Sequence, residues 1–381
     1  MRIVHLCLVG AYNEGWTYQE NLLSKYHSRL GHEVTLLCIP LEYHEGTLRV
    51  SSEVDYVNKE GVHVIRMPEK INIKNRIVFH RGVSEQLDRI SPDIIFIHGC
   101  QFWDIGEIRR YLKKHPQIIA YIDNHADFSN SATNWLTKNI LHKIIWKHGA
   151  NKIEPYIKKF YGVLPARVDF LTEVYQLPKE KCELLVMGAD DELVERAMNS
   201  DARHRIREIH GIENNDFLIV TGGKIDKWKT QTLLLMEAVN KLPNEKIKLI
   251  VFGSVADDLK EKVNSISDGI RVQYVGWIDA DKSYDYFAAS DLVVFPGRHS
   301  VFWEQVVGQG IPMIVKDWLG THHVDVGGNV KFLEDDSADE IAAIIQKLVE
   351  NRNEYDAMKR VAIEKGIPEF SYRSIAERAI S

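Results

Sequence analysis

Short apolar runs alternate with amphipathic, helix-like stretches along almost the whole chain, and this alternation limits the possible folds more than any other feature. The apolar runs are residues 3–9, 34–39, 93–98, 118–122, 217–220, 247–252, 272–275, 292–295 and 313–315. Runs of this length between polar loops are typical of buried parallel strands, whose connecting helices cover both faces of the sheet. The pattern therefore predicts an α/β protein built from two Rossmann-like, doubly wound parallel sheets.

The length of the chain also favours two domains. Its 381 residues exceed the size at which a single hydrophobic core usually stops growing. The alternation breaks between the two series of strands, where the sequence DARHRIREIHGIENND is charged and poor in β-formers. We therefore predict a first domain over residues 1–190, a linker over 191–215 and a second domain over 216–369.

Composition argues against several classes of protein. Hydrophobic residues make up 45% of the chain and charged residues 27%, which is ordinary for a globular protein. The net charge of −6 makes nucleic acid an improbable partner, because nucleic-acid-binding proteins carry a strongly cationic face. No apolar stretch approaches about 18 residues and the first strand lacks a cleavage site, so we expect no spanning helix, no signal peptide and a cytoplasmic protein. The four cysteines show no metal-ligand or disulfide spacing.

Glycines and lysines directly follow the apolar run 217–220, in the sequence GGKIDKWK. Glycine lets the backbone approach a ligand closely, so Gly223 can border a ligand on which Lys224 and Lys229 converge. A diphosphate is the ligand that two such lysines suit. The spacing is not that of a P-loop, and a solvated turn is the alternative interpretation.

A second cluster follows the run 292–295, as expected for ligand residues at the carboxyl ends of parallel strands. The loop with Gly297, His299 and Ser300 opens a helix, and free N–H groups at such a helix start favour phosphate. One turn later, Glu304 or Gln305 can accept hydrogen bonds from sugar hydroxyls. Taken alone, Glu304 is better explained as an exposed helix residue than as a ligand.

The first half offers a histidine and an aromatic loop. His125 follows the run 118–122 in the sequence DNHAD, and a histidine at a strand end can hydrogen-bond a hydroxyl in either protonation state. His98, which ends the run 93–98, is interpreted as structural. In the first βα loop, Gly15 can approach phosphates, and Trp16 and Tyr18 can stack on an acceptor sugar or simply pack the loop.

Taken in order, these motifs resemble the retaining GT-B glycosyltransferases of family four. The resemblance rests on Gly223–Lys229, on the tract Tyr274–Trp277 with Tyr286–Pro296, and on Phe370-Ser371-Tyr372. It implies two Rossmann-like domains facing across a cleft, with a C-terminal helix, residues 370–381, crossing back to the first domain. The family's E-x7-E signature is altered, since Gly310-Ile311-Pro312 aligns Gly297 and Gln305 with its two glutamates.

The resemblance implies a retaining transfer of a sugar from a nucleotide-diphosphate donor to a glycan or lipid-linked acceptor, in bacterial surface polysaccharide synthesis. Lys224 and Lys229 would neutralise the leaving diphosphate in place of a metal ion, and His125 would touch the donor sugar. No cofactor is expected beyond the sugar nucleotide itself. A sugar-nucleotide epimerase of the same architecture and a non-catalytic sugar-nucleotide-binding relative are the alternatives.

One further segment indicates a membrane contact. Residues 135–160, WLTKNILHKIIWKHGANKIEPYIKKF, hold six lysines against one glutamate, with Trp, Leu and Ile between them. A cationic amphipathic helix with aromatic residues is typical of helices that lie on anionic membranes. We predict a helix here, which either docks the protein at the inner face of the cell membrane or packs on its own domain.

Overall fold

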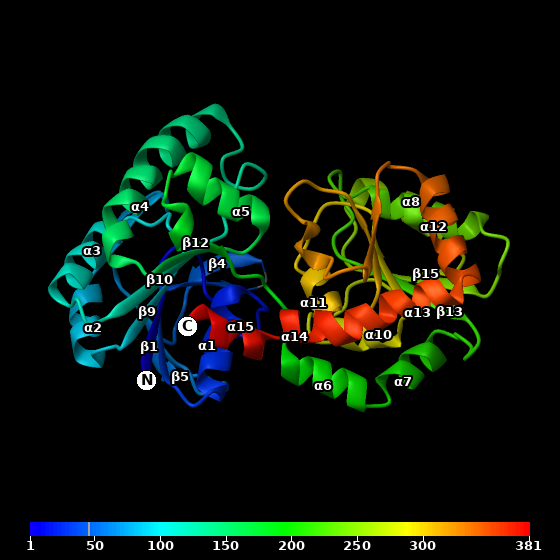
Figure 1. Cartoon of the computed structure of the whole chain (residues 1–381), viewed down its shortest axis with the longest axis horizontal. Helices are drawn as coiled ribbons and strands as arrows, with labels where there is room; N and C mark the ends of the chain where they lie inside the picture. Colours follow the sequence, from blue (N-terminus) through cyan, green and yellow to red (C-terminus); the bar gives the residue numbers. More distant parts are fainter. Residues whose placement is uncertain (45) are drawn as a thin grey trace. The chain divides into compact units, whose positions relative to one another are not determined.

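The computed structural model describes residues 1–44 and 46–381 and divides into two compact units (Figure 1). The first unit comprises Met1–Val186 and Ile375–Ser381, and the second comprises Met187–Ser374. Each unit holds one large, mainly parallel sheet with helices on both faces. The predicted α/β class with two Rossmann-like sheets is confirmed.

The sheet of the first unit has eight strands in the order β12-β11-β10-β9-β1-β2-β6-β5, and only β5 runs antiparallel to its neighbour. Most of the residues of its central strands are buried, because apolar side chains face a helix layer on either side. The strands are β1 (Arg2–Cys7), β2 (Glu33–Cys38), β5 (Asp55–Val57), β6 (His63–Arg66), β9 (Ile94–His98), β10 (Ile119–Asn124), β11 (Lys159–Gly162) and β12 (Cys182–Leu184).

Helices and two hairpins complete the first unit. The helices are α1 (Gln19–Arg29), α2 (Val83–Ile90), α3 (Ile105–Lys114), the π-type η1 (Thr137–Trp146), α4 (Lys147–Ile153), α5 (Pro165–Asp169), the π-type η3 (Phe170–Val174) and α15 (Tyr372–Ala379). The hairpins pair β3 (Leu41–His44) with β4 (Thr47–Val50) and β7 (Glu69–Ile73) with β8 (Ile77–His80). Sequence periodicity misses these hairpins, because their strands are largely exposed and carry no buried apolar run.

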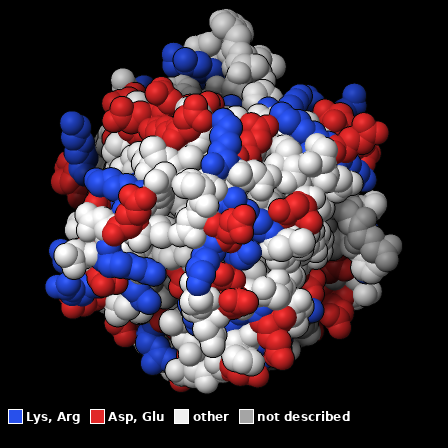
Figure 2. All heavy atoms as spheres, turned by 90° about the vertical axis from the view of Figure 1, so that its right-hand side faces the viewer, with Lys and Arg blue, Asp and Glu red and all other residues white. Residues whose placement is uncertain are grey.

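The sheet of the second unit has six parallel strands in the order β15-β14-β13-β16-β17-β18. The strands are β13 (Phe217–Gly222), β14 (Ile247–Phe252), β15 (Val272–Tyr274), β16 (Leu292–Phe295), β17 (Met313–Lys316) and β18 (Val330–Leu333). The helices are α6 (Asp191–Asn199), α7 (Ala202–Ile209), α8 (Gln231–Lys241), α9 (Lys260–Ile266), α10 (Ser283–Ala289), α11 (Phe302–Gly308), α12 (Ala338–Glu350), α13 (Arg352–Val361), the π-type η7 (Ala362–Gly366) and α14 (Ile367–Phe370). On the face of this unit shown in Figure 2, basic and acidic side chains lie interspersed.

Residues 191–215, predicted to be a linker, instead form α6 and α7, which pack against α10 within the second unit. Their charged side chains are paired in the folded unit. Arg203 Nη2 donates to Asp291 Oδ1 at 2.6 Å, and buried Arg207 donates to the carbonyl oxygen of Asp216 at 2.7 Å. The charged stretch therefore forms surface helices whose charged side chains are hydrogen-bonded within the second unit. The boundary between the units lies earlier, after Val186.

The predicted amphipathic helix over residues 135–160 is shorter in the structure. η1 and α4 form one helical stretch, Thr137–Ile153, and Phe160 already lies in β11. The helix ends before Pro155, which lacks an N–H donor and sits in a single 3-10 turn. Among the described residues, no helix is long and apolar enough to cross a bilayer.

Candidate active site

Each sheet reverses its strand order at one point, and the predicted site residues of each unit lie near that point of its own sheet. In the second unit the reversal lies between β13 and β16, and in the first unit it lies between β1 and β9. Open α/β sheets bind ligands beyond the carboxyl ends of the strands at such a switch point. All predicted site residues of the second unit lie in the segments after β13 and β16, so the fold brings them to one edge of one sheet.

The turn after β13 is shaped by glycine. A Cβ atom on Gly222 would stand 2.1 Å from the Phe252 ring, so a side chain there would collide with β14. Gly223 follows with a φ of +123°, in the region that favours glycine. The next residue, Lys224, is 65% exposed and forms an ion pair with Asp226 at 3.4 Å. The backbone therefore passes close to the end of β14 at Gly222, while the Lys224 ammonium projects into solvent.

Lys229 lies deeper, where the two loops meet. It is half-buried, and a Cβ atom on Gly297 would stand 3.8 Å from its Cα atom. Burial lowers the pKa of Lys229, Asp226 raises it, and Arg298 lowers it further, with a net shift downward. The loop after β16 thus borders the predicted diphosphate lysine, and this side chain is partly desolvated before any ligand arrives.

Glu304 is a buried carboxylate held by two histidines. His299 Nε2 donates to Glu304 Oε1 at 2.7 Å, and His323 Nε2 donates to the same oxygen at 2.9 Å. The Glu304 side chain is fully buried. Burial alone would raise its pKa, but His299 and His323 together hold the pKa well below its usual range. The His299 ring therefore binds Glu304 within the unit, and this contact is separate from any phosphate contact of the loop backbone.

These three side chains are also close enough together to hold a metal ion, since their ligand atoms lie within 4.8 Å of one another. The two nitrogen–oxygen distances of 2.7 and 2.9 Å are those of hydrogen bonds. Ligand atoms around a tetrahedral zinc ion stand about 3.3 Å apart. A metal-binding histidine also normally donates its second N–H, whereas His323 Nδ1 has no partner among the described residues. The group fits a hydrogen-bonded clamp better than a metal site.

Several buried polar atoms around this clamp lack a protein partner. Within residues 1–44 and 46–381 these include Glu304 Oε2, Gln305 Oε1 and both side-chain polar atoms of Gln309. Gln305, like Glu304, is buried. Ser300 lies two residues before α11, and its carbonyl oxygen accepts from the N–H of Trp303 at 2.9 Å. Buried polar atoms without partners are costly, so α11 and the residue after it offer hydrogen-bonding groups that the folded unit itself does not satisfy.

In the first unit, His125 follows the end of β10 as predicted. Its Nε2 atom lies 3.4 Å from Asp123 Oδ2, and its side chain is 37% exposed. Burial lowers the pKa of His125, but Asp123 raises it, and the net shift is upward. Asp123 is completely buried and also accepts from His98 Nδ1 at 2.7 Å and from the N–H of Gly99 at 2.9 Å.

Sequence reasoning missed the partners of His125. His98, interpreted as structural, shares the Asp123 carboxylate with His125. His98 in turn contacts His5, and His5 contacts His27 of α1, at 2.9 Å in each case. One signal was available: a histidine within the apolar run 3–9 needs a polar partner in the core.

The aromatic residues of the first loop pack on one another. The ring of Trp16 lies edge-on to Tyr18 at 5.1 Å and stacks on Tyr43 at 5.7 Å, between ring centroids. Tyr18 remains 49% exposed, and Gly15 adopts a φ of +77° with open space where a Cβ atom would stand. The loop follows β1 and His125 follows β10, at the same edge of the sheet, with β9 between them.

Comparison with known proteins finds a family similar to part of this chain. Residues 202–365, within the second unit, match the family model "Glycosyl transferases group 1". Among curated proteins, mannosylfructose-phosphate synthase from Agrobacterium fabrum is 23% identical over 232 residues, which cover 57% of this chain and 50% of that protein. The chain thus matches only about half the length of this relative.

Solved glycosyltransferase structures match the whole chain. A glycosyltransferase from Rickettsia africae has a TM-score of 0.69 at 15% identity, covering 99% of this chain and 96% of that one. Anabaena HepE, solved in complex with UDP and glucose, has a TM-score of 0.65 at 15% identity, covering 99% and 98%. At such identities the likeness shows the fold, which is that of the GT-B glycosyltransferases.

Proposed function

We propose that the protein, whose second unit matches the model of the glycosyl transferases group 1 family, transfers a sugar from a nucleotide diphosphate to an acceptor with retention at the anomeric carbon. One observation carries the proposal: half-buried Lys229 borders Gly297 where the loops after β13 and β16 meet. A fixed, partly desolvated cation at this place suits charge that develops on a departing diphosphate.

The residues divide this work between the units. Lys229 neutralises the diphosphate directly, and Lys224, on its flexible and exposed side chain, supplies a second charge. The backbone of residues 297–300 donates N–H groups to the phosphates. His125 hydrogen-bonds a hydroxyl of the donor sugar, while Gly15, Trp16 and Tyr18 line the acceptor side.

Replacement of Lys229 tests this mechanism. We expect Lys229→Ala to lower kcat about 100- to 1,000-fold, as loss of a transition-state electrostatic contact does, with the unfolding temperature unchanged. The matched control is Lys227→Ala, because Lys227 lies two residues away, is exposed and rests on the ring of Trp228. Rates for both variants on a set of UDP-, GDP- and ADP-sugars would decide, and near-normal turnover by Lys229→Ala would refute the mechanism.

Product analysis separates the alternatives. A transferase forms a glycosidic bond and releases the nucleoside diphosphate, with the anomeric configuration of the donor kept in the product. A hydrolysing epimerase instead releases a free sugar with inverted configuration at another carbon, and a non-catalytic relative releases nothing. Nuclear magnetic resonance of the products identifies which outcome holds.

We also propose that transfer requires no metal ion, because the lysines supply the positive charge at the diphosphate. We expect full activity after dialysis against EDTA, with no gain on adding Mg²⁺ or Mn²⁺. A rate that falls in EDTA and returns with one of these ions would assign the leaving-group charge to a metal instead.

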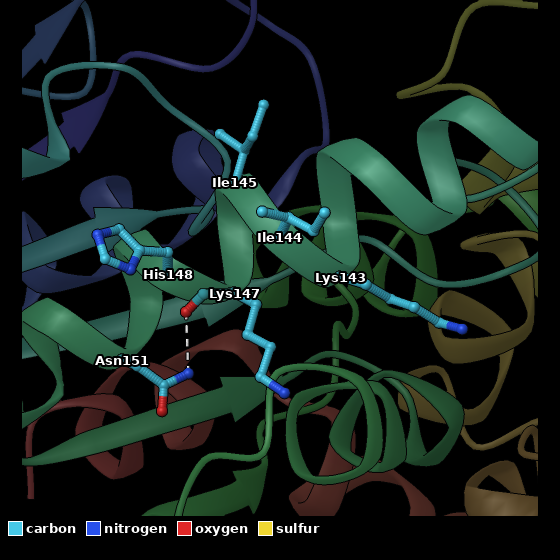
Figure 3. Close-up of a pocket in the computed structure, with 6 residues that line it drawn as sticks. All are labelled: Lys143, Ile144, Ile145, Lys147, His148 and Asn151. Atoms are coloured by element: carbon cyan, nitrogen blue, oxygen red, sulfur yellow. Dashed lines mark hydrogen bonds between the residues drawn. The ribbon is translucent and has the colours of Figure 1, made fainter.

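The acceptor is proposed to be a glycan or lipid-linked intermediate of bacterial surface polysaccharide synthesis, reached at a membrane surface. Figure 3 shows the pocket in η1 and α4 that supports this, lined by Lys143, Ile144, Ile145, Lys147, His148 and Asn151. Ile144 is 57% exposed beside these cations, and Trp135 just before η1 is 72% exposed. Exposed apolar side chains among lysines are typical of helices that lie on anionic lipid.

Vesicle binding tests the membrane contact. Replacing Lys138 and Lys143, both exposed, with Gln should weaken binding to anionic vesicles by about 1 kcal/mol per charge. Lys147 is a poorer probe than the sequence suggests, because it hydrogen-bonds Gln176 and is half-buried. Co-sedimentation that is unchanged by the double substitution would leave this helix with a packing role alone.

A further inference from the structure

A continuous chain of buried histidines runs through the core of the first unit, from α15 to the carboxyl edge of the sheet. His27 Nε2 lies 2.9 Å from the carbonyl oxygen of Ala376, and His27 Nδ1 lies 2.9 Å from His5 Nε2. His5 Nδ1 lies 2.9 Å from His98 Nε2, and His98 Nδ1 lies 2.7 Å from Asp123 Oδ2. The three rings are at most 5% exposed.

These four contacts fix the number of protons in the chain. The carbonyl oxygen of Ala376 and the carboxylate of Asp123 can only accept, so the ring nitrogens facing them must carry hydrogen. Each of the two nitrogen–nitrogen contacts takes one more hydrogen. Three neutral imidazoles hold three ring hydrogens, and four contacts need four. The chain therefore contains one proton beyond those of neutral rings and an ionised carboxylate.

The extra proton belongs on His98. Of the three rings, His98 is the one that contacts the carboxylate. Burial lowers the pKa of His27 to about 4, and burial together with the neighbouring rings lowers the pKa of His5. Burial raises the pKa of Asp123, but His98 and His125 hold it well below its usual range. Asp123 is thus the anion, and His98, as the ring in contact with it, is the place where the extra proton is best stabilised.

We propose that the chain of His27, His5 and His98 holds one extra proton next to Asp123. The three histidines thereby act as positioning residues for His125. Asp123 Oδ2 pairs with His98 Nδ1 at 2.7 Å, and His125 Nε2 lies 3.4 Å from the same oxygen without a hydrogen bond to it. A proton held on His98 neutralises this carboxylate, and His125 then remains a neutral hydrogen-bonding group. The role of a neutral His125 in sugar transfer rests on the proposed function, whereas the presence of the extra proton does not.

Other ionisable groups also face this chain. Besides the members themselves, Glu20 of α1 and Arg167 of α5 act on His125 in opposite directions, and His32 acts on His27. The thiols of Cys7 and Cys100 face Asp123, and burial raises the pKa of both, so they stay neutral and leave the proton count unchanged.

The proton count can be measured without any substrate. In protein labelled with 15N-histidine, an imidazolium shows hydrogen on both ring nitrogens and a neutral imidazole on one. At pH 8, where exposed histidines with a pKa of about 6.5 are neutral, we expect one doubly protonated ring among the three. Three singly protonated rings at this pH would overturn the proposal.

Replacing His98 tests the link to His125. In His98→Gln the amide can still donate to Asp123 but cannot hold the extra proton. His125 is then the histidine that balances the negative charge of Asp123. We expect the doubly protonated signal to vanish, and the His125 titration to move up by about one pH unit, with the pH profile of transfer following it. The matched control is His80→Gln, because His80 Nδ1 donates to buried Asp104 at 2.7 Å outside this chain.

The two readouts separate the inference from the proposed function. A shifted His125 titration in a protein that transfers no sugar supports the extra proton and refutes the activity. An unchanged titration in an active enzyme overturns the positioning role. If His98→Gln does not fold, the ring count in the wild-type protein still decides.

Discussion

Each unit buries one carboxylate between two histidines, and the two carboxylates are used differently. In the first unit both oxygens of Asp123 accept hydrogen bonds, one from the N–H of Gly99 and the other from His98, and His125 Nε2 lies 3.4 Å from the second oxygen. In the second unit His299 and His323 share one oxygen of Glu304. The other oxygen, Oε2, is buried without a partner among the described residues.

This difference indicates two ways of using a buried negative charge. Each oxygen of Asp123 already accepts a hydrogen bond inside the unit, so we expect it to affect a ligand through the histidine beside it. Glu304 keeps a strong acceptor in reserve, and a hydroxyl that reaches it would relieve an unsatisfied buried group. A residue that binds a ligand is therefore expected in the second unit and a residue that orients another is expected in the first.

Removing either carboxylate should have the largest effect on stability. We expect Glu304→Ala and Asp123→Ala each to lower the free energy of unfolding by about 3–5 kcal/mol, because each removal leaves two N–H donors without their acceptor and opens a cavity. Denaturant unfolding of the two variants would measure this. A loss below about 1 kcal/mol for Glu304→Ala would mean that its two histidines readily find other acceptors.

The inner end of the histidine chain predicts a pH dependence that is confined to the first unit. The pKa of His27 is lowered to about 4, below its unfolded value of about 6.5, so the unfolded state binds more protons between these values. Stability should therefore fall as the pH drops from 6.5 to 4, by about 3 kcal/mol from this group.

The His27→Gln variant isolates that contribution. We expect it to be less stable than the wild type at pH 7 but to lose less stability between pH 6.5 and pH 4. Unfolding curves at several pH values would show the two proteins converging in acid. Parallel curves would mean that His27 already carries a proton in the folded state.

The spare oxygen of Glu304 predicts an effect on ligand binding. We expect Glu304→Gln to weaken binding of a nucleoside diphosphate by about 1.5–3 kcal/mol, the range for a hydrogen bond to a charged group. Asp123→Asn should leave this affinity unchanged, because its oxygens are already occupied. Calorimetry on both variants measures these affinities. Equal losses of affinity would mean that the two carboxylates do not differ in how they act on the ligand.

The sequence predicts the sheets well and the carboxylate partners poorly, for a physical reason. Apolar runs such as 217–220 report burial directly, and strand ends such as that before His125 report the edge where ligands bind. Partners of Glu304 and Asp123 such as His323 and His98 come from other segments, which only the tertiary fold brings together. Local pattern indicates that a histidine within an apolar run needs a polar partner, but it does not identify that partner.

The smallest effect concerns Gln305, and it decides the register of α11. Gln305 occupies the second glutamate of the family signature when Gly310-Ile311-Pro312 is used as the anchor, yet the structure buries both Glu304 and Gln305. The amide oxygen of Gln305 has no partner in the described part of the chain, so it is a second candidate acceptor.

A neutral amide gains less than a carboxylate from a hydroxyl, so Gln305→Ala should weaken nucleoside diphosphate binding by only about 0.5–1.5 kcal/mol. Because Glu304 and Gln305 are adjacent, they point about 100° apart around the helix and cannot make the same contact. If Gln305→Ala weakens binding and Glu304→Gln does not, the ribose contact belongs to Gln305. Glu304 would then resemble Asp123, as a carboxylate that acts only by holding histidines in place.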